Sequence, residues 1–138
     1  MFGIYFFLIA LVNLIQCRSN GVSDVACSNL IPIHGDFQPQ SSIANVQIVP
    51  HAIKINRGQQ LKVTMYSSVS DFFFRGFIIQ ARTVSNNKIV GSFSATPSMK
   101  TLLCGYLHST ACHNSPSPKS NLLLVWKAPA NFRGNVRF

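Results

Sequence analysis

The order of apolar and polar side chains along the chain predicts several short β-strands. Residues 60–66 alternate between apolar and polar positions, which is the pattern of a strand with one buried face. Residues 72–84 are rich in aromatic and β-branched side chains and precede Ser-Asn-Asn and a second such run at 88–93, which predicts two strands joined by a tight turn. Residues 121–127 form an apolar run bounded by Pro118 and Pro129, as expected of a central strand.

These strands and the turn signals between them predict an all-β protein, an immunoglobulin-like antiparallel β-sandwich. Residues 19–51 carry Pro32, Pro39 and Pro50 among many Ser and Asn, so we expect extended coil with short strand segments there. Residues 134–138 have the pattern of a strand that has only begun. We therefore expect the sandwich to lack its last strand or strands in this chain, and we expect the closing strand to lie beside residues 121–127.

The first 17 residues have the apolar character of a signal peptide. The apolar run is shorter than the roughly 20 residues that a membrane-spanning helix needs. Cleavage after Cys17 would leave residues 18–138 as one mature domain, in line with the length of the chain. No later segment is long and apolar enough to anchor the chain, so we expect a secreted, extracellular protein with no membrane anchor.

The chain is strongly basic, with twelve Lys and Arg, three acids and a formal charge of +9. Such a charge attracts anionic partners. The basic residues are scattered and form no dense run of the kind found in nucleic-acid tails, so we expect no nucleic-acid partner. A solvated basic surface and an anion-binding face both fit this distribution. The candidates for an anion-binding face are Lys54, Arg57, Lys62, Arg75, Arg82 and Lys88.

Side chains able to hold a metal or carry catalysis are few. The set with zinc-type ligands is Cys104, His108, Cys112 and His113. Its two thiols are farther apart than the about two to four residues usual in zinc modules, and secretion favours disulfides over thiolate ligands. The three acids suggest no catalytic pair, and the chain has no nucleophile elbow or phosphate loop. We expect no enzyme, no metal and no other cofactor.

The cysteines of the mature chain, Cys27, Cys104 and Cys112, are odd in number. One thiol left over, retention of Cys17, or a partner beyond the end of the sequence would each account for this.

A series of short motifs resembles the reelin-domain (reeler) family. In chain order the motifs are Ala26-Cys27, Pro32-Ile33-His34-Gly35, Arg-Gly-Phe-Ile-Ile-Gln-Ala-Arg at 75–82, Val90-Gly91-Ser92-Phe93, Cys104, His113, Trp126-Lys127-Ala128-Pro129 and Gly-Asn-Val-Arg-Phe at 134–138. The chain is most similar to the small immune-induced defence proteins of insects within that family. The resemblance implies a disulfide between Cys27 and Cys104. The chain departs from the family pattern at Cys112, where the family has another residue type.

The resemblance implies a secreted protein of innate immune defence against bacteria. The positive charge suggests a mechanism, in which anionic envelope polymers such as lipopolysaccharide or teichoic acid are bound, with aromatic loops adding apolar contact. The alternative is an extracellular matrix or adhesion module that binds glycosaminoglycans, because reeler domains also occur in large matrix proteins. A third interpretation, the first part of a membrane ferric reductase, requires haem-binding helices, and this sequence shows none.

Overall fold

Two long strands with one apolar face each, β2 (Gln60–Ser67) and β8 (Asn121–Lys127), form the centre of the first sheet. They pair antiparallel, so that Leu61, Val63 and Met65 lie opposite Trp126, Leu124 and Leu122, and all six side chains are buried. The residues between them, Lys62 and Thr64 on β2 and the apolar Leu123 and Val125 on β8, lie on the other face of the sheet. The computed structural model describes residues 24–31, 36, 38 and 40–138, and the expected signal peptide therefore lies outside the described residues.

The first sheet has the strand order β1-β2-β8-β5, with β1 (Val46–Pro50) and β5 (Ser92–Phe93) at its edges. The prediction that residues 121–127 form a central strand is confirmed. The early coil contains a strand at β1, as expected, and also the 3-10 helix η2 (Asp24–Cys27), which was not predicted.

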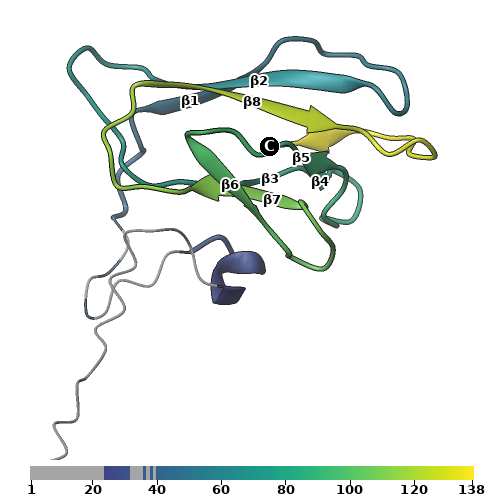
Figure 1. Ribbon diagram of the computed structural model, residues 1–138, viewed down its shortest axis with the longest axis horizontal. Coiled ribbons are helices and arrows are strands. Elements are labelled where there is room, and N and C mark those ends of the chain that lie inside the picture. The colour runs from purple at the N-terminus through teal and green to yellow at the C-terminus, as the bar shows by residue number, and fades with distance from the viewer. Residues whose placement is uncertain (1–23, 32–35, 37, 39) are drawn as a thin grey trace, which may run out of the picture.

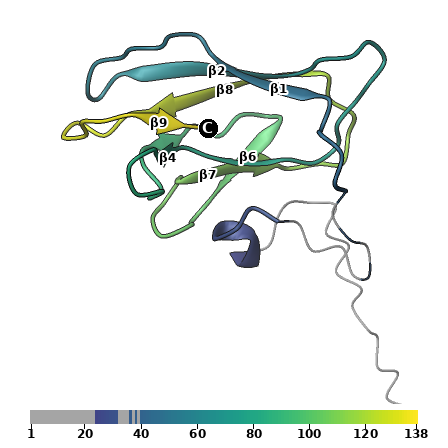
Figure 2. The same cartoon turned by 180° about the vertical axis from the view of Figure 1, so that it is seen from behind.

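The second layer faces the first across the core (Figures 1 and 2). It contains a three-stranded sheet of order β3-β7-β6, built from β3 (Ile78–Gln80), β7 (Thr110–His113) and β6 (Met99–Leu102). A two-stranded sheet pairs β4 (Arg82–Thr83) with β9 (Val136–Arg137). Every ladder is antiparallel, and the expected all-β sandwich is confirmed.

The predicted strand at 72–84 is shorter than its sequence suggests. Only β3 and β4 form ladders there, while the aromatic residues before them make a single bridge between Phe74 and Lys119. Phe74 and Phe77 pack edge to face with ring centroids 6.5 Å apart, so these rings fill the end of the core rather than extend a ladder. The predicted tight turn is present, because the Thr83 amide donates to the Lys88 carbonyl oxygen.

The prediction of where the last strand lies is wrong. β8 has β2 along its whole length on one side, and β5 beside Trp126 and Lys127 on the other. β9 instead pairs with β4, in the other layer. Between the hairpin that contains β4 and strand β5 of the first sheet lies Gly91, whose φ is 70°.

Trp126 fills the middle of the core, as its apolar strand suggests. It is 1% exposed, and its indole Nε1 donates to the Val90 carbonyl oxygen at 3.0 Å. The Phe138 ring meets it edge on, with centroids 5.5 Å apart. Gly91 lies directly against the indole, because a Cβ at this position would come within 2.4 Å of three indole atoms. The core therefore requires glycine at this position.

Candidate functional site

A disulfide fixes the start of the described chain to the second layer. Cys27, at the end of η2, is bonded to Cys104 in the loop after β6, across a sequence separation of 77 residues. This is the pairing that the family resemblance implies. Cys112 lies buried in β7, outside this bond.

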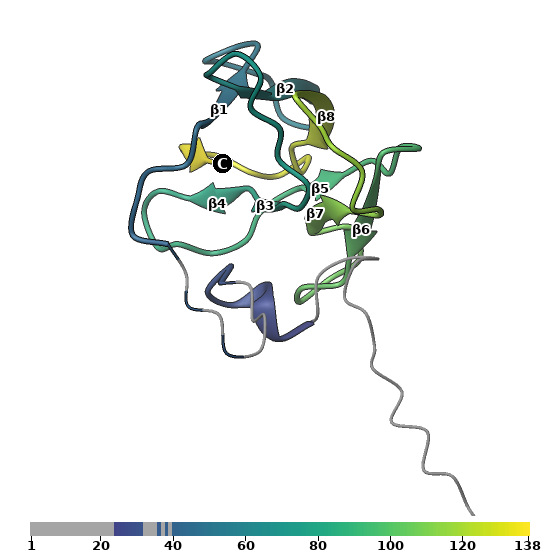
Figure 3. The same ribbon diagram turned by 90° about the vertical axis from the view of Figure 1, so that its left-hand side faces the viewer.

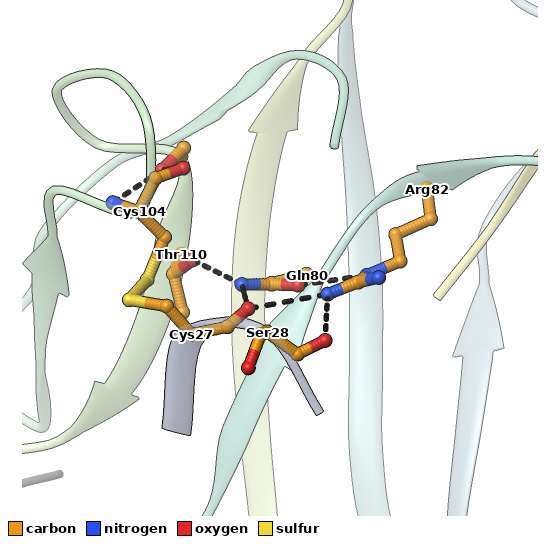
Figure 4. The surroundings of a disulfide bond; sticks show 7 residues. Cys27, Ser28, Gln80, Arg82, Cys104 and Thr110 are labelled. Atoms are coloured by element: carbon orange, nitrogen blue, oxygen red, sulfur yellow. Dashed lines mark hydrogen bonds between the residues drawn. A yellow bond between two sulfur atoms is a disulfide. The ribbon is translucent and has the colours of Figure 1, made fainter. Parts of the chain in front are cut away.

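Gln80 and Arg82 hold the backbone beside the disulfide (Figure 4). The Gln80 amide Nε2 donates to the Cys27 carbonyl oxygen and to Thr110 Oγ1, each at 2.9 Å. Arg82 Nη2 donates to the carbonyl oxygens of Cys27 at 3.2 Å and Ser28 at 2.9 Å, and its Nε donates to Gln80 Oε1 at 2.8 Å. The guanidinium of Arg82, a candidate anion-binding residue, thus caps backbone carbonyl oxygens.

Three more candidates from the sequence lie apart from one another. Arg75 donates to the Pro116 carbonyl oxygen at 3.1 Å, beside Lys119. Lys62 lies exposed on β2, and Lys88 lies exposed in the turn after β4. The six basic residues predicted as one anion-binding face are therefore not brought together.

Lys119 is a buried cation with a structural role. Its Nζ donates to the carbonyl oxygens of Arg75, Ser115 and Ser117 at distances of 2.8 to 3.2 Å. Burial, and then the nearby Arg75 guanidinium, lower the pKa of this ammonium group. The ammonium thus joins the loop before β3 to the loop before β8, and it is not available to a ligand.

The remaining two candidates, Lys54 and Arg57, lie in a cleft of about 950 Å³ that also contains two basic residues not predicted as candidates, Arg133 and Arg137. We call it the basic cleft. The lining comes from β1, the start of β2 and the segment between them, and from the last seven residues of the chain, with the end of β8 beneath them. It consists of Ile48, Pro50, Ala52, Ile53, Lys54, Ile55, Asn56, Arg57, Gln59, Leu61, Trp126, Ala128, Phe132, Arg133, Gly134, Asn135, Val136, Arg137 and Phe138.

The basic cleft carries uncompensated positive charge. Among its described lining residues there is no Asp or Glu. Arg137 donates from Nη2 to Asn87 Oδ1 at 2.8 Å, while the side chains of the other three cations make no hydrogen bond or ion pair with described residues. Four positive charges that share one concave surface attract anions more strongly than the same charges spread over a convex one. No pattern in the sequence indicates this group, because its two halves lie far apart along the chain.

The zinc-type set from the sequence is dispersed. Cys104 is in the disulfide, His108 Nδ1 lies 2.7 Å from Thr101 Oγ1, and His113 Nδ1 accepts from the Phe77 amide at 3.1 Å. Over the described part of the chain, no group of three or more His, Cys, Asp or Glu is arranged to hold a metal ion. In the same part there is also no helix with the length and apolar character to cross a membrane.

Comparison with known families and proteins gives consistent matches. The Reeler domain model matches residues 25–138. Defense protein l(2)34Fc of Drosophila melanogaster is 30% identical over 135 residues, which cover 90% of this chain and 77% of that protein. A relative from Antheraea mylitta, also named as a defense protein, is 28% identical over the whole chain, which spans 83% of it.

Longer relatives contain a similar segment. Ferric-chelate reductase 1 of Bos taurus is 30% identical over 139 residues, but the chain spans only 22% of that protein. A Danio rerio relative named for the same activity is 32% identical over 136 residues, and the chain spans 23% of it. The human F-spondin reeler domain, in its crystal structure, has a TM-score of 0.54 and 16% identity, covering 62% of this chain and 68% of that one. That likeness shows a shared fold.

Proposed function

The chain belongs to the Reeler domain family, and on this premise we propose that it is a secreted protein of innate immune defence that binds anionic polymers of the bacterial envelope. The relatives that it matches over most of their length are named as defense proteins, whereas the reductase relatives share only about a fifth of their length with it. The disulfide between Cys27 and Cys104 suits the oxidising environment outside the cell.

The observation that carries this proposal is the basic cleft. Lys54, Arg57 and Arg133 have side chains not committed to described neighbours, and they face one concave surface whose described lining has no acid. Phosphate and carboxylate groups of an envelope polymer would supply the missing negative charge. Arg75 and Arg82, also predicted as candidates, donate hydrogen bonds to backbone carbonyl oxygens instead.

A variant that lacks two cleft cations, Arg57→Gln with Arg133→Gln, should bind lipopolysaccharide and lipoteichoic acid about tenfold more weakly than the wild type at low salt, since exposed charge contacts contribute on the order of 0.7 kcal/mol each. Binding of the wild type should weaken as salt rises, because fields between exposed charges are screened within about 8 Å at physiological ionic strength. Titration calorimetry at several salt concentrations measures both effects.

The matched control is Lys62→Gln with Lys88→Gln, which removes the same charge from two exposed residues outside the cleft. It should retain most of the affinity. Equal losses in the two double variants would mean that only the overall field attracts the polymer. A protein that binds heparin more tightly than either bacterial polymer would favour the matrix or adhesion function.

A further inference from the structure

The basic cleft has an apolar floor that the binding of charged polymers does not explain. Ile48 and Pro50 of β1 lie opposite Met65 and Val63 of β2, so they share the inward face of the first sheet. Met65 is 4% exposed, whereas Ile48 is 39% exposed. The inward face of β1 is therefore less covered than that of β2, at the end of the sandwich where β9 lies between β1 and β4 (Figure 3).

The hydrophobic core lies directly beneath this floor. Leu61 and Trp126 are buried and line the cleft, and the partly buried Ile55 and Phe138 stand beside them. Ile53, at the mouth, is 96% exposed. Apolar side chains that stay exposed along a concave surface, as Ile48 and Ile53 do, favour an apolar occupant, because its burial removes both surfaces from water.

We propose that the basic cleft binds the lipid anchor of lipopolysaccharide, with an acyl chain on the apolar floor and the phosphate at the cationic rim. This inference rests on the proposed function and names the part of the polymer that the same cleft recognises. Charge complementarity selects this occupant: the rim carries Lys54, Arg57 and Arg133 with no acid among its described lining, so the ligand combines negative charge with hydrocarbon. A second copy of this chain, at +9, would be repelled. The volume of about 950 Å³ lies at the upper end of what small-molecule sites usually offer.

The test measures the affinity of the protein for butyl, octyl and dodecyl phosphate below their micelle concentrations. It distinguishes the contribution of the alkyl chain from that of the charged headgroup. The headgroup is constant in this series, so a floor that takes hydrocarbon should raise the affinity by up to roughly fourfold for each methylene that it buries. Acylated lipopolysaccharide should likewise bind at least tenfold more tightly than its alkali-deacylated form. Equal affinity across the series, or for the two forms, would overturn the inference, while binding of the deacylated polymer would still support the proposed function.

Two double variants locate the effect. Ile48→Thr with Ile53→Ser changes two cleft residues that are 39% and 96% exposed. This double variant should reduce the increase of affinity with alkyl chain length. Leu123→Thr with Ile43→Ser alters side chains that are 45% and 95% exposed outside the cleft, and should leave the rise unchanged. Thermal midpoints confirm that both fold. The double variant Arg57→Gln with Arg133→Gln should lower the affinity for every alkyl phosphate in the series by the same factor.

Two results would assign the apolar floor differently. A rise with chain length that survives Ile48→Thr with Ile53→Ser would place the hydrocarbon elsewhere and overturn the inference. Sedimentation that shows a dimer in the wild type and a monomer in this variant would identify the floor as an interface between copies, and would overturn it as well.

Discussion

Replacement of Gly91 by Ala is expected to destabilise the fold by about 3–5 kcal/mol, enough to prevent secretion or to lower the thermal midpoint by roughly 10 °C or more. The new methyl would come within 2.4 Å of three atoms of the Trp126 indole. That ring is held in place by its hydrogen bond to Val90 and by the edge of Phe138, so it has little room to move. The φ of 70° adds a further cost for any residue with a side chain.

Gly105 provides a matched control, because its φ is 90° and a Cβ there would meet nothing within 4 Å. Gly105→Ala therefore carries the backbone cost without the clash and should destabilise the protein by about 1–2 kcal/mol. Urea denaturation of both variants measures the difference. Equal losses would show that the core around the indole relaxes freely, and that Trp126 does not require glycine beside it.

Removal of the disulfide is expected to cost about 4 kcal/mol, since Cys27 and Cys104 close a loop with a separation of 77 residues. The double variant Cys27→Ala with Cys104→Ala removes the bond without leaving a reactive thiol at either position. Gln80 and Arg82 would still bind the Cys27 carbonyl, so part of the turn would remain in place. Thermal unfolding of the variant and of the oxidised wild type gives the difference.

Reduction of the wild type supplies the control. The reduced wild type should unfold close to the double variant, and the oxidised form well above both. Peptide mapping must also find the bond between Cys27 and Cys104. A bond between Cys104 and Cys112, with Cys27 released, would contradict the structure.

The long strands could be predicted from the sequence because large apolar side chains at every second residue form their buried face. The β6–β7 hairpin could not. Its buried positions include Thr110, Ala111 and Cys112, which are small or polar, and the hydroxyl oxygen of Thr110 accepts a hydrogen bond from Gln80, a distant residue. A buried strand of this composition carries no hydrophobic pattern, and Cys112 and His113 within it have the side chains of metal ligands instead.

The candidate site was only half predictable for a related reason. Lys54 and Arg57 stand close together in the sequence and could be proposed as a pair, but Arg133 and Arg137 reach the same cleft only through the pairing of β9 with β4. The same positive charge predicted Arg82 as a ligand-binding residue. The hydrogen-bonding needs of the Cys27 and Ser28 carbonyls, which only the fold reveals, assign its guanidinium to the structure.

Nuclear magnetic resonance of the ¹⁵N-labelled protein during titration with deacylated lipopolysaccharide tests most directly whether the basic cleft is the anion site. The largest shifts are expected at the backbone amides of residues 53–57 and 133–137 and at the guanidinium signals of Arg57 and Arg133. Lys62, Lys88 and Arg82 should move little. Shifts spread evenly over all basic residues, or concentrated around Lys62 and Lys88, would contradict the assignment of anion binding to the cleft.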